Sequence, residues 1–207
     1  MHGNSYISLS SNVFRAFIAI TLSPEIQLGL AQTIDNLQNQ LRRAPIRWVQ
    51  PRNIHLTVKF LGNVSAANQG LLTRCLVAEA SRHTAFELSI GGLGVFPTLN
   101  RPKVIWVGIE APAELLMIHK GIEGEMARLG YAPEPRAFSP HLTLGRVSRN
   151  VRSDEYQLIS SAINQSKVGF LGALRVSSLE LIRSDLKPDG AIYTRLFSAS
   201  LADKTVQ

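Results

Sequence analysis

Two histidine and threonine pairs supply the side chains needed for acid–base chemistry on an anion. Each pair lies in one of two similar stretches, HLTVKF at 55–60 and HLTLGR at 141–146. Because alternate residues of an extended strand share a face, His55 would lie beside Thr57, and His141 beside Thr143. Two imidazoles can act as a general acid and a general base near neutral pH, and the hydroxyls can donate hydrogen bonds to anionic oxygens. The same alternation predicts that Lys59 shares the face of His55 and Thr57.

Positive charge is concentrated around these two stretches. The chain has a formal net charge of +7 and a pI near 10.0. Residues 36–78 contain six arginine and lysine residues, residues 135–153 contain four arginines, and neither window contains Asp or Glu. This distribution predicts an anion-binding site at the repeated stretches. Because metal ions in proteins favour histidine together with carboxylates, we expect neither a metal ion nor another cofactor there.

The composition is typical of a globular protein with a full core. The chain has 207 residues, 45% of them hydrophobic, and no apolar run approaches the roughly 18–20 residues of a membrane span. Cys75 is the single cysteine, so no intramolecular disulfide can form, which fits a reducing cytoplasm. Residues 1–13 are predicted to form a flexible tail without a secretory signal, and residues 14–207 a single domain. We expect a cytoplasmic monomer with no membrane contact.

The order of the predicted elements repeats along the chain. The first half reads as strand FRAFIAITL, a helix from Pro24, the His55 strand, a helix from Ser65 to about Arg82, and strand FELSIGGLGVF. The second half reads as strand KVIWVGIE, a helix from Pro112 to Gly130, the His141 strand, a helix at 153–166, and strands ALRVSSLELIRS and AIYTRLFSASL. We therefore predict an α+β fold. Two β-α-β-α-β units related by a pseudo-two-fold axis would form two lobes, with mostly antiparallel sheets lining a central cleft and helices outside.

Several segments together resemble the two-histidine phosphoesterases, and among them the bacterial RNA 2′,3′-cyclic phosphodiesterases, historically called 2′-5′ RNA ligases. The resemblance spans roughly residues 14–201 and includes RAFIAI, HLTVKFLG, GVFP, RPKVIWVGIE, RAFSPHLTLGR and a late LELIRSDL…Y segment that ends at Tyr193. A single His-x-Thr is a weak signal, whereas two in matching contexts at this spacing are specific. The extension before Arg15 departs from the family pattern.

The resemblance implies hydrolysis of RNA 2′,3′-cyclic phosphate ends, or of cyclic nucleotides, to 2′-phosphomonoesters without a metal ion. It also implies that His55 is the proton donor and His141 the proton acceptor. These roles rest on the resemblance alone, because the two stretches are too alike for the sequence to rank them. Thr57 and Thr143 are expected to bind the phosphate oxygens. Reversible 2′-5′ joining of RNA ends remains open.

Other residues are candidates for contacts with the phosphate or the base. Strict alternation places Arg146 on the face opposite His141, but a bulge at Gly145 would turn it toward the phosphate, as the resemblance implies. Phe17, Trp48 and Phe138 are candidates for base stacking, and Arg136 for an RNA contact. Core packing is the stronger expectation for Phe17 and for Trp106, while Trp48 and Phe138 lie beside arginines and near the motifs.

Two other classes of protein remain as alternatives. A metal-dependent hydrolase would be sensitive to chelators, although neither basic window contains a carboxylate. An RNA-end-binding protein without catalysis would use the basic windows, but it gives no reason for paired histidine and threonine faces. A turnover assay with a cyclic nucleotide distinguishes this binding protein from an enzyme.

Overall fold

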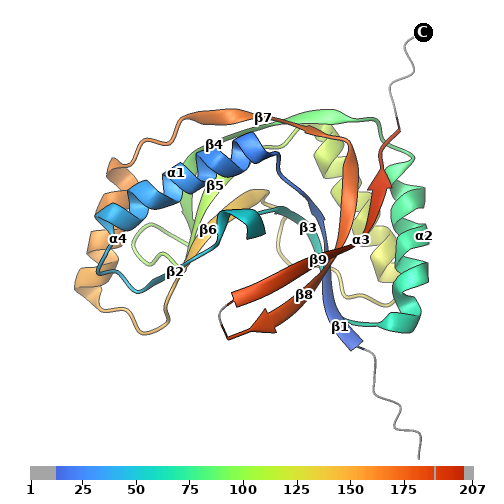
Figure 1. The fold of residues 1–207 in the computed structure, drawn as a ribbon, viewed down its shortest axis with the longest axis horizontal. Helices are drawn as coiled ribbons and strands as arrows, with labels where there is room; N and C mark the ends of the chain where they lie inside the picture. Colours follow the sequence, from blue (N-terminus) through green and yellow to red (C-terminus); the bar gives the residue numbers. More distant parts are fainter. Residues whose placement is uncertain (1–12, 189, 203–207) are drawn as a thin grey trace, which may run out of the picture.

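Two antiparallel sheets form the centre of the computed structural model, which describes residues 13–188 and 190–202 (Figure 1). The first sheet has the strand order β3-β1-β8-β9: β3 (Leu56–Ser65), β1 (Val13–Ile20), β8 (Ser178–Lys187) and β9 (Gly190–Ser200). The second has the order β2-β6-β5-β4-β7: β2 (Ile46–Trp48), β6 (His141–Val147), β5 (Val104–Glu110), β4 (Phe86–Phe96) and β7 (Phe170–Val176). The predicted α+β class with antiparallel sheets is confirmed.

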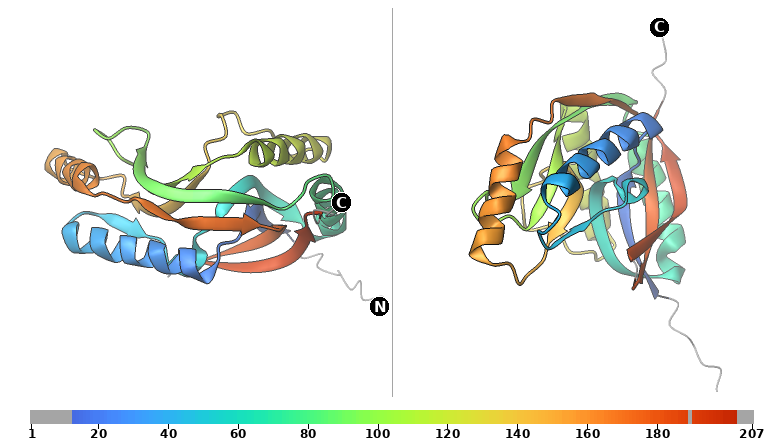
Figure 2. Two further views of the ribbon diagram at one scale, coloured as in Figure 1. Left: turned by 90° about the horizontal axis from the view of Figure 1, so that it is seen from above. Right: turned by 60° about the vertical axis from the view of Figure 1, so that its left-hand side comes forward.

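The helices cover the two sheets separately. Seen from above in Figure 2, α1 (Pro24–Gln40) and α4 (Ser153–Gln165) lie at one end, and α2 (Gln69–Ala80) and α3 (Ala113–Arg128) at the other. α1 packs on β7 of the second sheet, while α2 and α3 pack on strands of the first. Short 3-10 helices, η1 (Pro51–Asn53) and η2 (Ala66–Asn68), flank β3. None of the helices in the described segments is long and apolar enough to cross a membrane.

Each sheet takes strands from both halves of the sequence repeat. β4 closes the first predicted unit but pairs with β5 and β7 in the second sheet. The segment predicted as one strand, ALRVSSLELIRS, instead divides at Ser177 into β7, which pairs with β4, and β8, which pairs with β1. The predicted tail lies outside the described residues except for Val13, which begins β1. Each lobe is therefore built from strands of both halves of the chain, not from one half alone.

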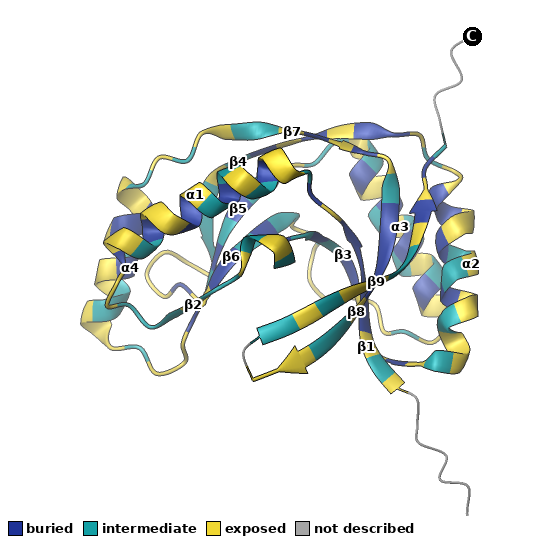
Figure 3. Cartoon of the chain, in the orientation of Figure 1, coloured by how far each residue is buried: buried dark blue, intermediate teal, exposed yellow. Residues whose placement is uncertain are grey.

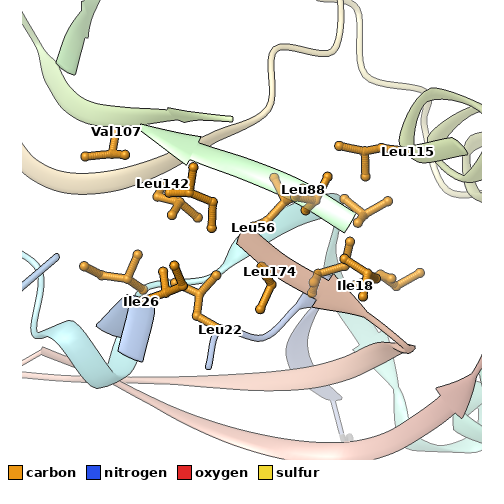
Figure 4. Close-up of a cluster of buried hydrophobic side chains, with 14 of the residues drawn as sticks. Ile18, Leu22, Ile26, Leu56, Leu88, Val107, Leu115, Leu142 and Leu174 are labelled. Carbon is orange, nitrogen blue, oxygen red and sulfur yellow. The ribbon is translucent and has the colours of Figure 1, made fainter. Parts of the chain in front are cut away.

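One hydrophobic core fills the space behind both motif strands. Leu56 follows His55, Leu142 follows His141, and both leucine side chains are buried in the same cluster. Figure 4 shows them together with Ile18 of β1 and Leu174 of β7. Figure 3, coloured by burial, shows buried residues where the helices face the sheets and exposed residues on the outer faces of the helices. The apolar positions of the two motifs thus fix which face carries the polar side chains.

A bulge in β3 changes the position of Lys59. The register with β1 pairs Ala19 with Thr57 but Ile18 with Lys59, so β3 contains one extra residue between them. Ile18 faces the core, and Lys59 is turned to that side, with only 2% of its side chain exposed. Its Nζ donates to Oε2 of Glu123 on α3 at 2.9 Å and to the carbonyl oxygen of Ala132 at 2.7 Å. The expectation that Lys59 shares the face of His55 is therefore wrong.

The buried Lys59–Glu123 pair generates a stability prediction. Lys59→Met should lower the free energy of unfolding by about 3–5 kcal/mol, because it leaves the Glu123 carboxylate buried without its cation. The double variant Lys59→Met/Glu123→Leu should recover most of this loss, because no uncompensated charge remains. Urea denaturation followed by circular dichroism measures both.

The matched control is Arg128→Gln, which removes an exposed guanidinium from the carboxylate of Glu125. That change should cost no more than about 1 kcal/mol. A Lys59→Met protein as stable as the control would show that the buried pair does not hold β3 against α3.

Candidate active site

The two motif histidines are held by the same backbone contact. Nδ1–H of His55 donates to the carbonyl oxygen of Asn53 at 2.9 Å, and Nδ1–H of His141 donates to that of Ser139 at 2.8 Å. A carbonyl oxygen can only accept a hydrogen bond, so the proton of each neutral ring lies on Nδ1. Nε2 of each ring is then the atom available for proton transfer.

Aromatic rings surround His55. The ring of Phe17 stacks on the imidazole with centroids 4.5 Å apart, and the ring of Tyr193 meets it edge-on at 5.2 Å. Phe17 is only 3% exposed, so one face of the imidazole is shielded from water. Burial lowers the pKa of His55 to about 4, although the hydrogen bond to Asn53 acts in the opposite direction. In the free protein His55 is thus neutral at pH 7.

His141 has a similar setting on the second sheet. The ring of Phe96 meets it edge-on at 4.9 Å, and the ring of Trp106 lies 6.4 Å away. Burial lowers the pKa of His141, and the charge of Arg146 lowers it further, while the hydrogen bond to Ser139 raises it. Both imidazoles therefore favour the neutral form.

A second bulge directs Arg146 to the face of Thr143. The register of β5 with β6 pairs Trp106 with Thr143 but Ile105 with Gly145, which leaves Leu144 as an extra residue. Val104 pairs with Arg146 and shares a face of β5 with Trp106, so Arg146 and Thr143 also share a face. This irregularity beside Gly145 agrees with the bulge that the sequence predicts.

The motif strands of the two sheets approach each other. β3 of the first sheet and β6 of the second are in contact. Burial raises the pKa of the Tyr193 hydroxyl, while the charges of Arg146, Arg15 and Arg47 lower it. Because β3 begins next to His55 and β6 begins at His141, the contact between these strands supports one site for both histidines.

The candidates for base contacts lie in different places. Phe17 is in the site, but it supports the His55 ring. Trp48 pairs with Gly145 and packs against the main core, and the ring of Phe138 stacks on His119 with centroids 3.9 Å apart. Arg136 is 90% exposed and pairs with Glu134 at 3.6 Å. These contacts give no support for base stacking by Phe17, Trp48 or Phe138.

Sequence reasoning missed several aromatic residues of the site. Tyr193 and Phe96 contact the histidines, and Phe60 is a 62% exposed ring opposite Phe17. Trp106, expected in the core, lies opposite Thr143 and packs flat on Gly94, where an added Cβ would collide with the indole. The glycine at 94, in the stretch GGLGVF, could have indicated that an aromatic side chain packs on this part of β4.

No metal-binding cluster accompanies the histidines. Across residues 13–188 and 190–202, no group of three or more His, Cys, Asp or Glu side chains is close enough to share an ion.

A model of the LigT-like phosphoesterases matches residues 20–106 of this chain, a range that includes His55. The RNA 2′,3′-cyclic phosphodiesterase of Methanothermobacter thermautotrophicus is 33% identical over 182 residues, which are 87% of this chain and 95% of that protein. That of Aeropyrum pernix is 33% identical over 161 residues, or 76% and 88% of the two chains. The chain belongs to the RNA 2′,3′-cyclic phosphodiesterase family.

Solved structures agree with this assignment. The structure of Escherichia coli LigT complexed with 3′-AMP superposes with a TM-score of 0.71 at 26% identity, over 91% of this chain and 98% of that chain. The protein TT0787 of Thermus thermophilus superposes with a TM-score of 0.76 at 24% identity, over 92% and 99% of the two chains, and supports the fold alone.

The burial of His55 generates a titration prediction. In a ¹³C or ¹⁵N NMR titration the pKa of His55 should lie near 4, well below the ordinary value of 6.5. Phe17→Ala should move that pKa upward, because water would reach the imidazole face and stabilise the charged form.

Phe170→Ala, which removes an exposed ring from β7, should leave the titration of His55 unchanged. A His55 pKa at or above its ordinary value in the unaltered protein would contradict the burial argument.

Proposed function

We propose that this protein hydrolyses the 2′,3′-cyclic phosphate ends of RNA, and cyclic nucleotides, to 2′-phosphomonoesters without a metal ion. The observation that carries the proposal is the pair of His-x-Thr strands. Each holds its imidazole by the same Nδ1–H contact, and the two strands meet where the sheets adjoin. Membership of the cyclic phosphodiesterase family names the substrate class.

The proposed reaction uses the two imidazoles as base and acid. Nε2 of His141 takes a proton from water as the water oxygen forms a bond to phosphorus. Nε2 of His55 gives a proton to the ribose 3′-oxygen as the bond from phosphorus to that oxygen breaks. The products are a 3′-hydroxyl and a 2′-phosphomonoester. Proton exchange with solvent then resets both rings.

Neighbouring side chains stabilise the phosphate as its charge grows. The hydroxyls of Thr57 and Thr143 donate to the non-bridging oxygens, and Arg146 supplies a positive charge on the same face as Thr143. Thr57 and Thr143 are half-buried, so their hydrogen bonds would act in a partly dehydrated site.

The lowered pKa values of the two histidines fit a reaction in which the anionic substrate itself promotes protonation of one imidazole. Neutral His141 is ready to accept a proton, whereas His55 must gain a proton before it can act as the acid. A bound phosphate favours the imidazolium form and raises the pKa of His55. The negative charge of the substrate therefore helps to produce the acid that it requires.

The same groups suit a second nucleophile. If a 5′-hydroxyl of RNA replaces water as the nucleophile, the proposed acid and base join the ends through a 2′-5′ bond. We also propose that the protein is a monomer and that it works in the cytoplasm. The single cysteine and an RNA substrate support that location.

Product analysis tests the proposed reaction. Purified protein is incubated with a cyclic-phosphate oligonucleotide in excess chelator, and the expected product is the 2′-phosphomonoester. His55→Ala and His141→Ala should each lower kcat/KM by about 10²-fold or more.

The matched control is His119→Ala on α3, which should retain activity. Dependence on a divalent ion would favour a metal-dependent hydrolase, and binding of the oligonucleotide without turnover would favour the non-catalytic alternative. Near-normal activity of either motif variant would contradict the two-histidine mechanism.

A sulfur substrate separates the two proposed roles. Replacing the ribose 3′-oxygen by sulfur makes the leaving group a thiolate, which departs readily without protonation because a thiol has a pKa of only about 8.5. His55→Ala should then be impaired on the oxygen substrate and largely restored on the sulfur substrate.

His141→Ala should remain impaired on both substrates, because water must still lose a proton. The reverse pattern would exchange the roles of the two residues. Restoration of neither variant would show that the histidines act mainly by holding the phosphate.

A further inference from the structure

Three arginines from both sheets lie near the part of β9 that carries Tyr193, beside the histidines. Arg15 of β1 pairs with Ser184 of β8, which pairs with Tyr193 of β9, so Arg15 and Tyr193 lie in one cross-strand row on the same face of the first sheet. The segment that follows Arg47 of β2 is tied to β9 by the hydrogen bond from Asn53 to Ala191. In agreement with this arrangement, the charges of Arg146, Arg15 and Arg47 all lower the pKa of the Tyr193 hydroxyl. All three side chains are exposed. They converge from strands that are far apart in the sequence, so the fold itself gathers this positive charge.

Two of these arginines face each other without a counter-ion. The register of β2 and β6 places Arg47 directly opposite Arg146. Like charges at such positions destabilise a pair of strands. Among the described residues none of the three arginines forms an ion pair, whereas many arginines elsewhere contact carboxylates, including Arg82, Arg128, Arg152 and Arg183. The arrangement is suited to an anion from outside the chain.

The arginines lie at different places relative to the histidines. Arg146 shares a face of β6 with Thr143, so in the proposed function it lies beside the reacting phosphate. Arg15 precedes Phe17 by two residues on the same face of β1, which is about 7 Å along the strand. Phe17 in turn stacks on His55. Arg15 therefore extends the site away from the reacting centre, along the direction of β1.

Arg47 extends the site in the same way on the second sheet. It is one strand beyond Arg146, counted from β5, and the segment that follows it is tied to β9 through the hydrogen bond from Asn53 to Ala191. The Tyr193 hydroxyl lies between the contributions of the two sheets and can itself donate a hydrogen bond. One phosphate at this position would be within reach of two guanidinium groups and a phenol.

We propose that Arg15 and Arg47, together with the Tyr193 hydroxyl, form a second phosphate subsite that binds the phosphodiester preceding the cyclic end of the RNA. Guanidinium groups match this ligand because they bind phosphate oxygens through paired hydrogen bonds. The preferred substrate is then an RNA strand with at least one internal phosphate, rather than a cyclic mononucleotide. This inference rests on the proposed hydrolysis of cyclic phosphate ends.

Two substrates test the subsite. One is a cyclic mononucleotide, and the other is a dinucleotide with the same cyclic end and one internal phosphodiester. The unaltered protein should show a kcat/KM at least about tenfold higher for the dinucleotide, which is the effect of one charge-assisted hydrogen bond. This ratio should fall as salt increases, because the internal phosphate releases counter-ions on binding.

Matched variants identify the residues responsible. Arg15→Gln/Arg47→Gln should reduce the ratio to near one, mainly through loss of activity on the dinucleotide. Arg74→Gln removes the same type of exposed charge from α2, on the far side of the first sheet, and should keep the ratio. A ratio that survives in the double variant, or that falls equally in Arg74→Gln, would overturn the subsite.

A neutral linkage separates charge from base stacking. A dinucleotide whose internal linkage is a methylphosphonate keeps both bases, so any stacking on the exposed Phe60 ring remains. With the unaltered protein it should be hydrolysed like the mononucleotide, and a retained preference would assign the effect to stacking and overturn the proposal. If neither charged substrate is hydrolysed, the proposed function itself fails, and equal hydrolysis of both removes only the subsite.

Discussion

The hydrogen bond from Nδ1–H of each motif histidine to a carbonyl oxygen two residues earlier constrains the whole site. It requires non-strand backbone immediately before each motif strand, and that backbone must be fixed. Asn53, which supplies the carbonyl for His55, also donates its Nδ2–H to the carbonyl oxygen of Ala191 on β9 at 3.0 Å. The connection leading to His141 is held by Lys59 of β3, which donates to Ala132. Each histidine therefore depends on residues distant in sequence.

The two copies of the motif differ where the substrate requires a difference. A cyclic phosphate has a leaving oxygen on one side of phosphorus and attacking water on the other, so two identical half-sites would not define a direction. Thr57 has Ala19 opposite it, whereas Thr143 has Trp106. The same bulge, three residues after each histidine, brings Phe60 to the face in the first copy and Arg146 in the second. The duplicated strands thus carry an apolar side and a cationic side.

Periodicity predicted most elements because helices and strands with one buried face reveal their period in the sequence. It could not predict which strands pair, since β4 and β8 join sheets far from their sequence neighbours. It also failed at bulges, where alternation breaks. In the second copy Gly145 marked the irregularity and correctly allowed Arg146 to turn, but the first copy contains no glycine before Gly62, and Lys59 was misplaced. Tyr193 had no local signal, because only tertiary pairing brings β9 beside His55.

The electrostatics of the free site are unfavourable for a protonated imidazole. Burial favours neutral imidazoles, and Arg146 adds to that effect at His141. Surrounding arginines oppose any further positive charge until an anion enters. A bound phosphate offsets the positive charge of the arginines. Its negative charge also favours the protonated form of a neighbouring imidazole. Neutral ligands offer no such compensation, so we expect the two sequence windows without Asp or Glu to favour anionic ligands over neutral ones.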